Sequence, residues 1–180
     1  MIIREDCALL VVDLQERLIP KIQDHDRVVD YAVRTIRFFR ALERPVIWAE
    51  QYPKGLGPTV PAVASELEGV ERREKLAFGF FGDPAIATAV RLTNARQVII
   101  VGVETHVCVL QTALGALEAG LEAYVVAEAT GSRRASDRDA ALARMAAEGV
   151  RVATFEMALF ETLRKAGTPE FKAATALVDK

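Results

Sequence analysis

Residues 97–109 read Gln-Val-Ile-Ile-Val-Gly-Val-Glu-Thr-His-Val-Cys-Val, which is the most informative stretch of the chain. The apolar run 98–101 predicts a strand, Gly102 ends it, and Cys108 follows where a helix is expected to begin. The free N–H groups and positive dipole end of a helix start favour thiolate over thiol, which is typical of a reactive cysteine with a lowered pKa. The alternative is a buried, unreactive cysteine, since cysteine is among the most buried residue types.

Apolar, β-branched segments alternate with amphipathic segments along the whole chain. Strands are predicted at residues 7–14, 45–50, 70–75, 97–103, 122–127 and 150–154. Helices are predicted at residues 27–42, 84–93, 107–119, 137–148, 155–166 and 169–178. This alternation predicts an α/β fold, with a parallel sheet covered by helices on both faces. The strands at 8–12 and 98–101 are apolar throughout, as strands buried on both sides are.

Residues at the predicted helix ends agree with these boundaries. Ser136 precedes an acidic first turn and is predicted to cap a helix, while Gly120 and Gly149 each follow one. The longest irregular stretch, residues 51–58, follows the second strand. Loops at the carboxyl ends of strands bind ligands in open α/β sheets, although an ordinary crossover loop explains this stretch equally well.

Composition limits the classes of protein to consider. The 180 residues suit a single domain, 1–180, with a full core. The net charge of −2, with Lys and Arg scattered along the sequence, argues against a nucleic-acid partner, and no apolar run has the length of a membrane span. The first residues lack the features of a secretory signal, so a cytoplasmic location is expected.

The two cysteines, Cys7 and Cys108, are expected to be free thiols. One opens the first strand and the other follows the end of a later strand. In parallel strands this separates them by roughly 15–20 Å. A disulfide requires Cα atoms within about 7 Å.

Two further side chains could carry chemistry. Asp13 ends the first strand, where a carboxylate either caps a helix or belongs to a site at the carboxyl edge of the sheet. Lys75 ends the third strand within a charged run, where lysines are usually solvated. The apolar, aromatic segment 76–81 that follows could instead place this ammonium at the edge of a pocket.

The histidines do not suit a cysteine–histidine dyad. His106 is two residues from Cys108, and residues i and i+2 do not face each other on a helix. His25 lies in a polar stretch expected to be an exposed turn. A carboxylate such as Asp13, with Lys75 stabilising the thiolate, is the available alternative. Two distant histidines also argue against a zinc site, and Arg133 and Arg134 suit either an anion or surface ion pairs.

These residues together resemble the isochorismatase-like cysteine hydrolase superfamily. Asp13 in Val-Val-Asp-Leu-Gln, Lys75 in Glu-Lys and Cys108 in Gly-Val-Glu-Thr-His-Val-Cys-Val match its Asp, Lys and Cys in order and spacing. The match covers nearly the whole chain. Segments 50–57, 132–138 and 141–145 resemble the subgroup of isochorismatase domain-containing proteins.

The resemblance implies a three-layer α/β/α sandwich whose six parallel strands have the order 3-2-1-4-5-6. It also implies a cis peptide between Val103 and Glu104, with the backbone N–H groups of Glu104 and Cys108 forming an oxyanion hole. Relatives assemble as dimers or larger, so a homo-oligomer is expected. Nicotinamidases of the superfamily have a histidine-containing metal site near the loop after strand two. Residues 51–58 contain no histidine, so neither a metal nor another cofactor is expected.

The expected function is hydrolysis of a C–N, amide-type bond of a small molecule by an Asp13–Lys75–Cys108 triad. One alternative is hydrolysis of an isochorismate-like vinyl ether with Asp13 as the acid, which needs no cysteine. Another is a binding protein with a vestigial site. Substrate contacts are expected from Leu18, Trp48, Gln51, Phe78, Phe80 and Thr105, whose aromatic members would equally suit plain core packing.

Overall fold

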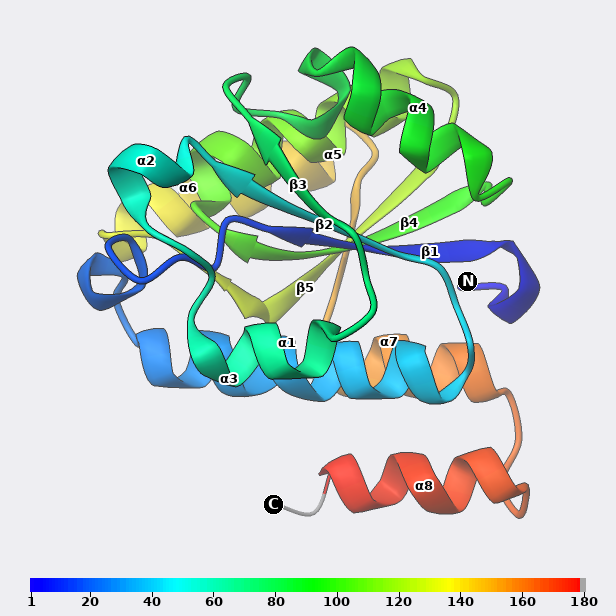
Figure 1. The fold of residues 1–180 in the computed structure, drawn as a ribbon. Helices are drawn as coiled ribbons and strands as arrows, with labels where there is room; N and C mark the ends of the chain where they lie inside the picture. The colour runs from blue at the N-terminus through cyan, green and yellow to red at the C-terminus, as the bar shows by residue number, and fades with distance from the viewer. Residues whose placement is uncertain (179–180) are drawn as a thin grey trace.

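The computed structural model describes residues 1–178, and its centre is a parallel sheet of six strands (Figure 1). The spatial order is β3-β2-β1-β4-β5-β6, as the resemblance implies. The strands are β1 (Cys7–Val12), β2 (Val46–Gln51), β3 (Arg72–Lys75), β4 (Gln97–Val103), β5 (Glu122–Gly131) and β6 (Arg151–Ala153). Each predicted strand is present, so the α/β fold and its sheet order are confirmed.

The two central strands are buried along their whole length. β1 and β4 pair in parallel, with Leu9 opposite Ile99 and Val12 opposite Gly102. Their side chains alternate between the two faces of the sheet, and both faces are covered by helices. This explains why neither strand shows polar residues at alternate positions.

Helices cover both faces of the sheet and complete a three-layer sandwich. Figure 1 shows α1, α3 and α7 below the sheet, with α8 farther out, and α4 and α5 above it. The helices are α1 (His25–Ala41), α2 (Pro53–Leu56), α3 (Pro61–Ala64), α4 (Pro84–Leu92), α5 (Leu110–Glu118), α6 (Ala135–Ala147), α7 (Phe155–Leu163) and α8 (Pro169–Val178). A π-helical turn, Thr105–Val109, connects β4 to α5.

A hydrophobic core lies on each side of the sheet. Leu9 and Val11 pack with Ile36 and Phe39 of α1 on one side. On the other side, residues of β1 and β4 such as Leu10 and Ile100 pack with α4, α5 and α6, and Cys108 belongs to this second core. Cys108 therefore lies on the face of the sheet opposite α1.

Three local predictions need correction. β5 continues to Gly131, four residues beyond its predicted end at residue 127, because Thr130 and Gly131 still pair with Gly102 and Val103 of β4 after a register shift. Ser136 does not cap a helix, since α6 begins at Ala135 and its N-cap position is Arg134. His25 is not in an exposed turn but begins α1 and is half-buried.

The segment after β2 is also less irregular than predicted, because it contains the short helix α2. The predicted glycines Gly120 and Gly149 do follow α5 and α6, both with left-handed backbone angles. Cys7 and Cys108 are both free and buried, which confirms the prediction of two free thiols.

Candidate active site

The three candidate catalytic residues meet at the carboxyl edge of the sheet. Asp13 follows β1, and Cys108 lies in the π-helical turn after β4. Lys75 is the last residue of β3, which is two strands away from β1 in the sheet. β2 lies between β1 and β3, and its last residue Gln51 pairs with Lys75. Adjacent parallel strands thus bring together residues that are up to 95 positions apart (108 − 13).

Lys75 is buried and all three of its ammonium hydrogens have an acceptor. Its Nζ donates to Asp13 Oδ2 at 2.7 Å, to Gln51 Oε1 at 2.8 Å and to the Phe78 carbonyl at 2.8 Å. Its side chain and that of Asp13 have no exposed surface. The solvated lysine considered from the sequence is therefore wrong, and the ammonium is held rigidly against the carboxylate.

Asp13 uses one carboxylate oxygen for Lys75 and leaves the other without a hydrogen-bond partner among residues 1–178. Burial raises the pKa of Asp13 to about 6, although the charge and hydrogen bond of Lys75 act to lower it. The neighbouring Cys108 thiol also acts to lower this pKa, by a smaller amount, so the thiol lies near the carboxylate.

The backbone of β4 makes room for this carboxylate. A Cβ atom on Gly102 would lie 1.9 Å from the carbonyl oxygen of Val12, and the glycine has φ +126°. Only a residue without a side chain permits β4 to approach the end of β1 this closely. Asp13, directly after Val12, itself has φ +53°.

Cys108 is 6% exposed, and the expected lowering of its thiol pKa is wrong in direction. Burial raises this pKa above its ordinary value, and the nearby Asp13 charge raises it further. The Lys75 charge and a hydrogen bond from the Glu104 backbone act in the opposite direction but are weaker. Desolvation therefore exceeds any effect of the helix start, and the resting group is a neutral thiol that needs a base.

Glu104 connects the end of β4 to the cysteine. The peptide bond between Val103 and Glu104 is cis. The Glu104 carbonyl accepts hydrogen bonds from the N–H groups of Val107 at 3.0 Å and Val109 at 3.1 Å. Its carboxylate accepts from Arg133, in the loop after β5.

Gln51 and Phe78 touch the triad, as expected of site residues. Gln51 orients Lys75 through its side-chain oxygen, and its Nε2 donates to the Leu76 carbonyl at 2.9 Å. Phe78 contributes its carbonyl, while its ring is 53% exposed. Both residues therefore fix the ammonium.

Sequence reasoning missed Gln15, which supports Gln51. Its Nε2 donates to the carbonyls of Gln51 at 3.0 Å and Gly57 at 2.7 Å, and its Oε1 accepts from the Gln51 N–H at 2.8 Å. Gln15 is fully buried. A polar residue two positions after Asp13 carries no sequence signal for such burial.

The other expected substrate contacts lie farther into the protein. Trp48 belongs to the core on the α1 face, where its Nε1 donates to Thr59 Oγ1, and Leu18 packs against that core. Phe80 is fully buried in the opposite core. Thr105 is fully buried, and its hydroxyl has no hydrogen-bond partner in the described chain.

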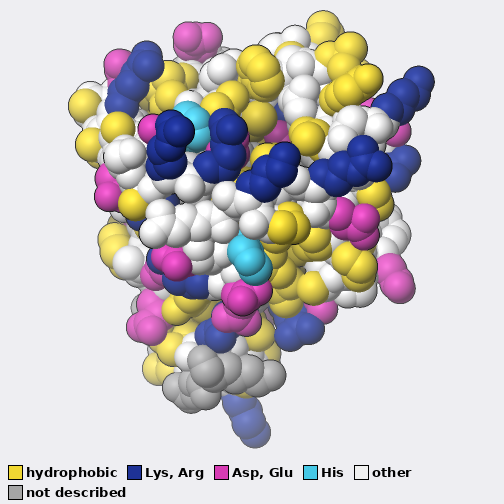
Figure 2. Space-filling view, turned by 90° about the vertical axis from the view of Figure 1, so that its left-hand side faces the viewer, with side chains coloured by type: hydrophobic (Ala, Val, Ile, Leu, Met, Phe, Trp, Pro, Cys, Tyr) yellow, Lys and Arg dark blue, Asp and Glu magenta, His cyan; other side chains and the backbone are white. Residues whose placement is uncertain are grey.

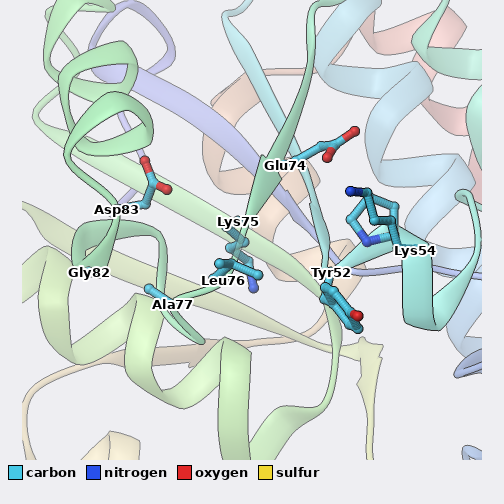
Figure 3. Close-up of a pocket in the computed structure, with 9 residues that line it drawn as sticks. Tyr52, Lys54, Glu74, Lys75, Leu76, Ala77, Gly82 and Asp83 are labelled. Carbon is cyan, nitrogen blue, oxygen red and sulfur yellow. The ribbon is translucent and has the colours of Figure 1, made fainter.

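A cavity of about 500 Å³ adjoins the triad on the side of β3. Figure 3 shows Lys75 and Leu76 at its centre, with Tyr52 and Lys54 on one side and Asp83 on the other. Its volume is in the range of sites that bind small molecules. Of the three candidate catalytic residues, Lys75 is the one that lines it.

Neither histidine contacts the cysteine by a hydrogen bond within residues 1–178. His106 Nδ1 lies 3.0 Å from Ser132 Oγ, and His25 pairs with Asp26. Among the described residues, no group of three or more His, Cys, Asp or Glu side chains is arranged to hold a metal ion. No helix in this part of the chain has both the length and the apolar character of a membrane span.

Basic side chains that are scattered in the sequence gather at the carboxyl edge. The face of the molecule at this edge carries a row of Lys and Arg side chains (Figure 2). Arg17 follows β1, Lys54 lies in α2, and Arg133 and Arg134 follow β5, and all four are exposed. The loops around the triad are thus more basic than the net charge of −2 indicates.

Comparison with known proteins gives consistent results. The family model described as isochorismatase domain matches residues 7–157. Isochorismatase domain-containing protein 2A of Mus musculus is 37% identical over 172 residues, which are 95% of this chain and 82% of the mouse protein.

Solved structures extend the comparison to the fold. A MAR1 ribonuclease from Caenorhabditis elegans has a TM-score of 0.93 at 36% identity, covering 99% of this chain and 92% of that one. YcaC from Pseudomonas aeruginosa, solved with hexane-2,5-diol and covalent acrylamide, has a TM-score of 0.91 at 28% identity. The match covers 98% of this chain and 90% of that one. YcaC from Escherichia coli, described as an octameric hydrolase of unknown specificity, has a TM-score of 0.88 at 25% identity. The match covers 98% of this chain and 86% of that one. With its sheet order, its Asp–Lys–Cys cluster and these matches, the chain belongs to the isochorismatase family.

Proposed function

We propose that this protein hydrolyses a C–N, amide-type bond of a small molecule with Cys108 as nucleophile. The observation that carries the proposal is the buried Lys75–Asp13 pair, whose second carboxylate oxygen has no partner and whose carboxylate lies beside the thiol. A neutral buried thiol requires an adjacent base, and Asp13 occupies that position.

Acylation follows from this arrangement. Cys108 Sγ forms a bond to the carbonyl carbon, and its proton passes to Asp13. The oxyanion is stabilised by the backbone N–H groups of Glu104 and Cys108. When the C–N bond breaks, Asp13 returns the proton to the leaving amine.

Deacylation uses the same groups. A water molecule attacks the thioester and gives a proton to Asp13, a carboxylic acid is released, and the thiolate regains the proton. Lys75 keeps its charge throughout and stabilises both the thiolate and the ionised Asp13. The reaction needs no cofactor.

The relatives support a hydrolase with a nucleophilic side chain, because acrylamide bonds to nucleophiles through its alkene carbon. The P. aeruginosa YcaC structure holds covalent acrylamide, and E. coli YcaC is described as a hydrolase.

The test is intact-protein mass spectrometry with a panel of small amides, ureas and esters. We expect a mass increase equal to the acyl group with the wild-type chain. The Cys108→Ala variant should show no increase and no turnover, whereas Cys7→Ala, a matched control at the other buried cysteine, should behave as wild type. Turnover of an isochorismate-like vinyl ether, added to the panel, that survives in Cys108→Ala would instead favour vinyl-ether hydrolysis with Asp13 as the acid. A binding protein with a vestigial site would give neither adduct nor turnover.

RNA hydrolysis is a second candidate, favoured by the row of basic residues and by the ribonuclease from C. elegans. A fluorescently labelled RNA belongs in the same assay for this reason. We expect no cleavage, because the triad is buried and cannot reach a phosphodiester backbone without the chain opening. Cleavage that requires Asp13 would favour the second candidate.

A further inference from the structure

Glu104 is held by a residue that the proposed reaction does not use. Its Oε2 accepts a hydrogen bond from the Arg133 backbone N–H at 3.2 Å and another from Arg133 Nε at 3.0 Å. Glu104 is only 7% exposed, whereas the Arg133 side chain is 58% exposed. An exposed arginine thus fixes a buried carboxylate at the edge of the site.

The extension of β5 explains how these residues meet. β5 pairs with β4 up to Gly131, which lies opposite Val103, so the next residues of each strand leave the sheet side by side. The Oγ atom of the buried Ser132 lies 3.0 Å from His106 Nδ1, and Arg133 Nε donates a hydrogen bond to Glu104 Oε2. The loop after β5 therefore binds the turn after β4 at two residues, one before and one after Thr105.

Every polar group of Glu104 points to a specific partner. Its backbone lies near enough to the Cys108 thiol to lower the thiol pKa, its carbonyl accepts from the N–H groups of Val107 and Val109, and its carboxylate accepts from Arg133. The backbone N–H is the group that the proposed reaction assigns to the oxyanion. If the carboxylate were released, the residue would lose its one side-chain anchor within the described chain.

We propose that Arg133 is a positioning residue, which holds the backbone N–H of Glu104 in place as an oxyanion donor through the Glu104 carboxylate. This inference rests on the proposed function. Hydrogen-bond donors stabilise an oxyanion only when they are fixed in advance, and loss of one donor lowers kcat by about 10²- to 10³-fold. Arg133 touches neither the thiol nor Asp13 by a hydrogen bond in the described residues.

Two reactions of the same thiol separate this role from a general structural one. With p-nitrophenyl acetate, Sγ forms a bond to the carbonyl carbon, Asp13 takes the thiol proton, and p-nitrophenolate leaves after an oxyanion intermediate. With iodoacetamide, Sγ displaces iodide at a saturated carbon, Asp13 again takes the proton, and no oxyanion forms. Only the first reaction forms an oxyanion that the Glu104 N–H would stabilise, whereas in the second reaction this N–H has only its small effect on the thiol pKa.

The experiment measures both rates in wild type, Arg133→Ala, Glu104→Ala and Glu104→Gln. Arg134→Ala is the matched control, since this exposed neighbour makes no side-chain hydrogen bond or ion pair within residues 1–178. We expect acylation to fall about tenfold in Arg133→Ala and about 100-fold in Glu104→Ala, because small misplacements of catalytic groups have effects of this size. Glu104→Gln keeps an acceptor oxygen for Arg133 and should stay within about threefold of wild type.

Alkylation by iodoacetamide should stay within about twofold of wild type in all of these variants, because the thiol and Asp13 are unchanged and the Glu104 backbone has the smallest of the named effects on the thiol pKa. Equal acylation rates in wild type and Arg133→Ala would overturn the inference while leaving the proposed function standing. A parallel fall of both rates would also overturn it, because the pair would then support the fold or the thiol. Absence of acylation in the wild-type chain would overturn the proposed function and the inference together.

Discussion

At the scale of single residues, burial governs the chemistry of the triad. Asp13 has a pKa of about 6 and Cys108 has a raised thiol pKa, both mainly because of burial. In the proposed reaction, a proton moves between two groups whose charged forms are both disfavoured by burial in this site. Lys75 offsets this cost, since its ammonium lies 2.7 Å from the carboxylate.

The first prediction concerns pH. Asp13 must be ionised to accept the thiol proton, so kcat/KM should be nearly constant above about pH 7, half-maximal near the pKa of about 6, and lower at more acidic pH. The rate of Cys108 acylation by p-nitrophenyl acetate as a function of pH measures this limb. A profile that is flat between about pH 5 and 8 would contradict the role of Asp13 as base. Asp13→Asn should lose the limb near pH 6.

The second prediction concerns Lys75→Met. Removal of the ammonium leaves Asp13 as an unpaired buried carboxyl, so its pKa should rise above about 6 and the limb should move to higher pH. Breaking a buried pair costs about 3–5 kcal/mol, which urea denaturation would measure as a lower free energy of unfolding. Lys54→Met, at an exposed lysine in the same cavity, should change stability by less than about 0.5 kcal/mol. Equal losses of stability in Lys75→Met and Lys54→Met would contradict the assignment of Lys75 as the buried partner of Asp13.

At the scale of secondary-structure elements, the approach of β4 to β1 positions the carboxylate. Gly102 lies opposite Val12, the residue before Asp13, and there is no space for a side chain at this point. The helices outside the sheet do not contribute a triad side chain. The site depends instead on how closely the ends of the strands approach one another.

The third prediction tests this close approach with Gly102→Ala. Its Cβ would lie 1.9 Å from the Val12 carbonyl oxygen, in a left-handed conformation. The expected loss of stability is about 3 kcal/mol or more, from overpacking and backbone strain together. Gly120→Ala is the control, because it shares the left-handed conformation but has open space around it, and should cost about 1–2 kcal/mol. Calorimetry of the three chains compares the costs, and equal values would contradict the close contact.

Element boundaries show where sequence patterns are informative. The strands rich in Val and Ile were predictable to within two residues at most ends, because apolar runs record burial directly. The end of β5 was not, because Ala129 and Gly131 are residue types depleted in strands, and the strand is continued there by the pairing of Thr130 and Gly131 with β4. The cap at Ser136 failed because the helix begins one residue earlier.

At the scale of the whole molecule, the assembly and the single domain 1–180 stay predictions. E. coli YcaC is described as octameric, and the side chains of Leu76, Phe78 and Tyr52, all near the triad, are more than half exposed. Exposed apolar side chains of this size often mark surfaces that bind another chain.

The fourth prediction is a mass in solution of at least twice that of one chain, because burial of these apolar side chains against another copy is favourable. Size-exclusion chromatography with light scattering measures it. A mass equal to a single chain at micromolar concentration would show that the expected homo-oligomer is wrong. The substitution Leu76→Lys should lower the measured mass if this surface lies in the interface.

The sequence by itself determined the alternation of strands and helices, because apolar periodicity reflects which faces are buried. It also determined the candidate triad, since Asp13, Lys75 and Cys108 each follow or end a predicted strand and parallel strands end at one edge. The strand order came from family resemblance rather than from the pattern.

Only the tertiary structure decided the electrostatics and the supporting contacts. The direction of the Cys108 pKa shift depends on which atoms exclude water around the thiol, and local sequence does not record them. The contacts of Gln15 with Gln51 and of Arg133 with Glu104 join residues 36 and 29 positions apart. The stretch 97–109 thus places the cysteine, but the packing of distant segments determines how the thiol can react.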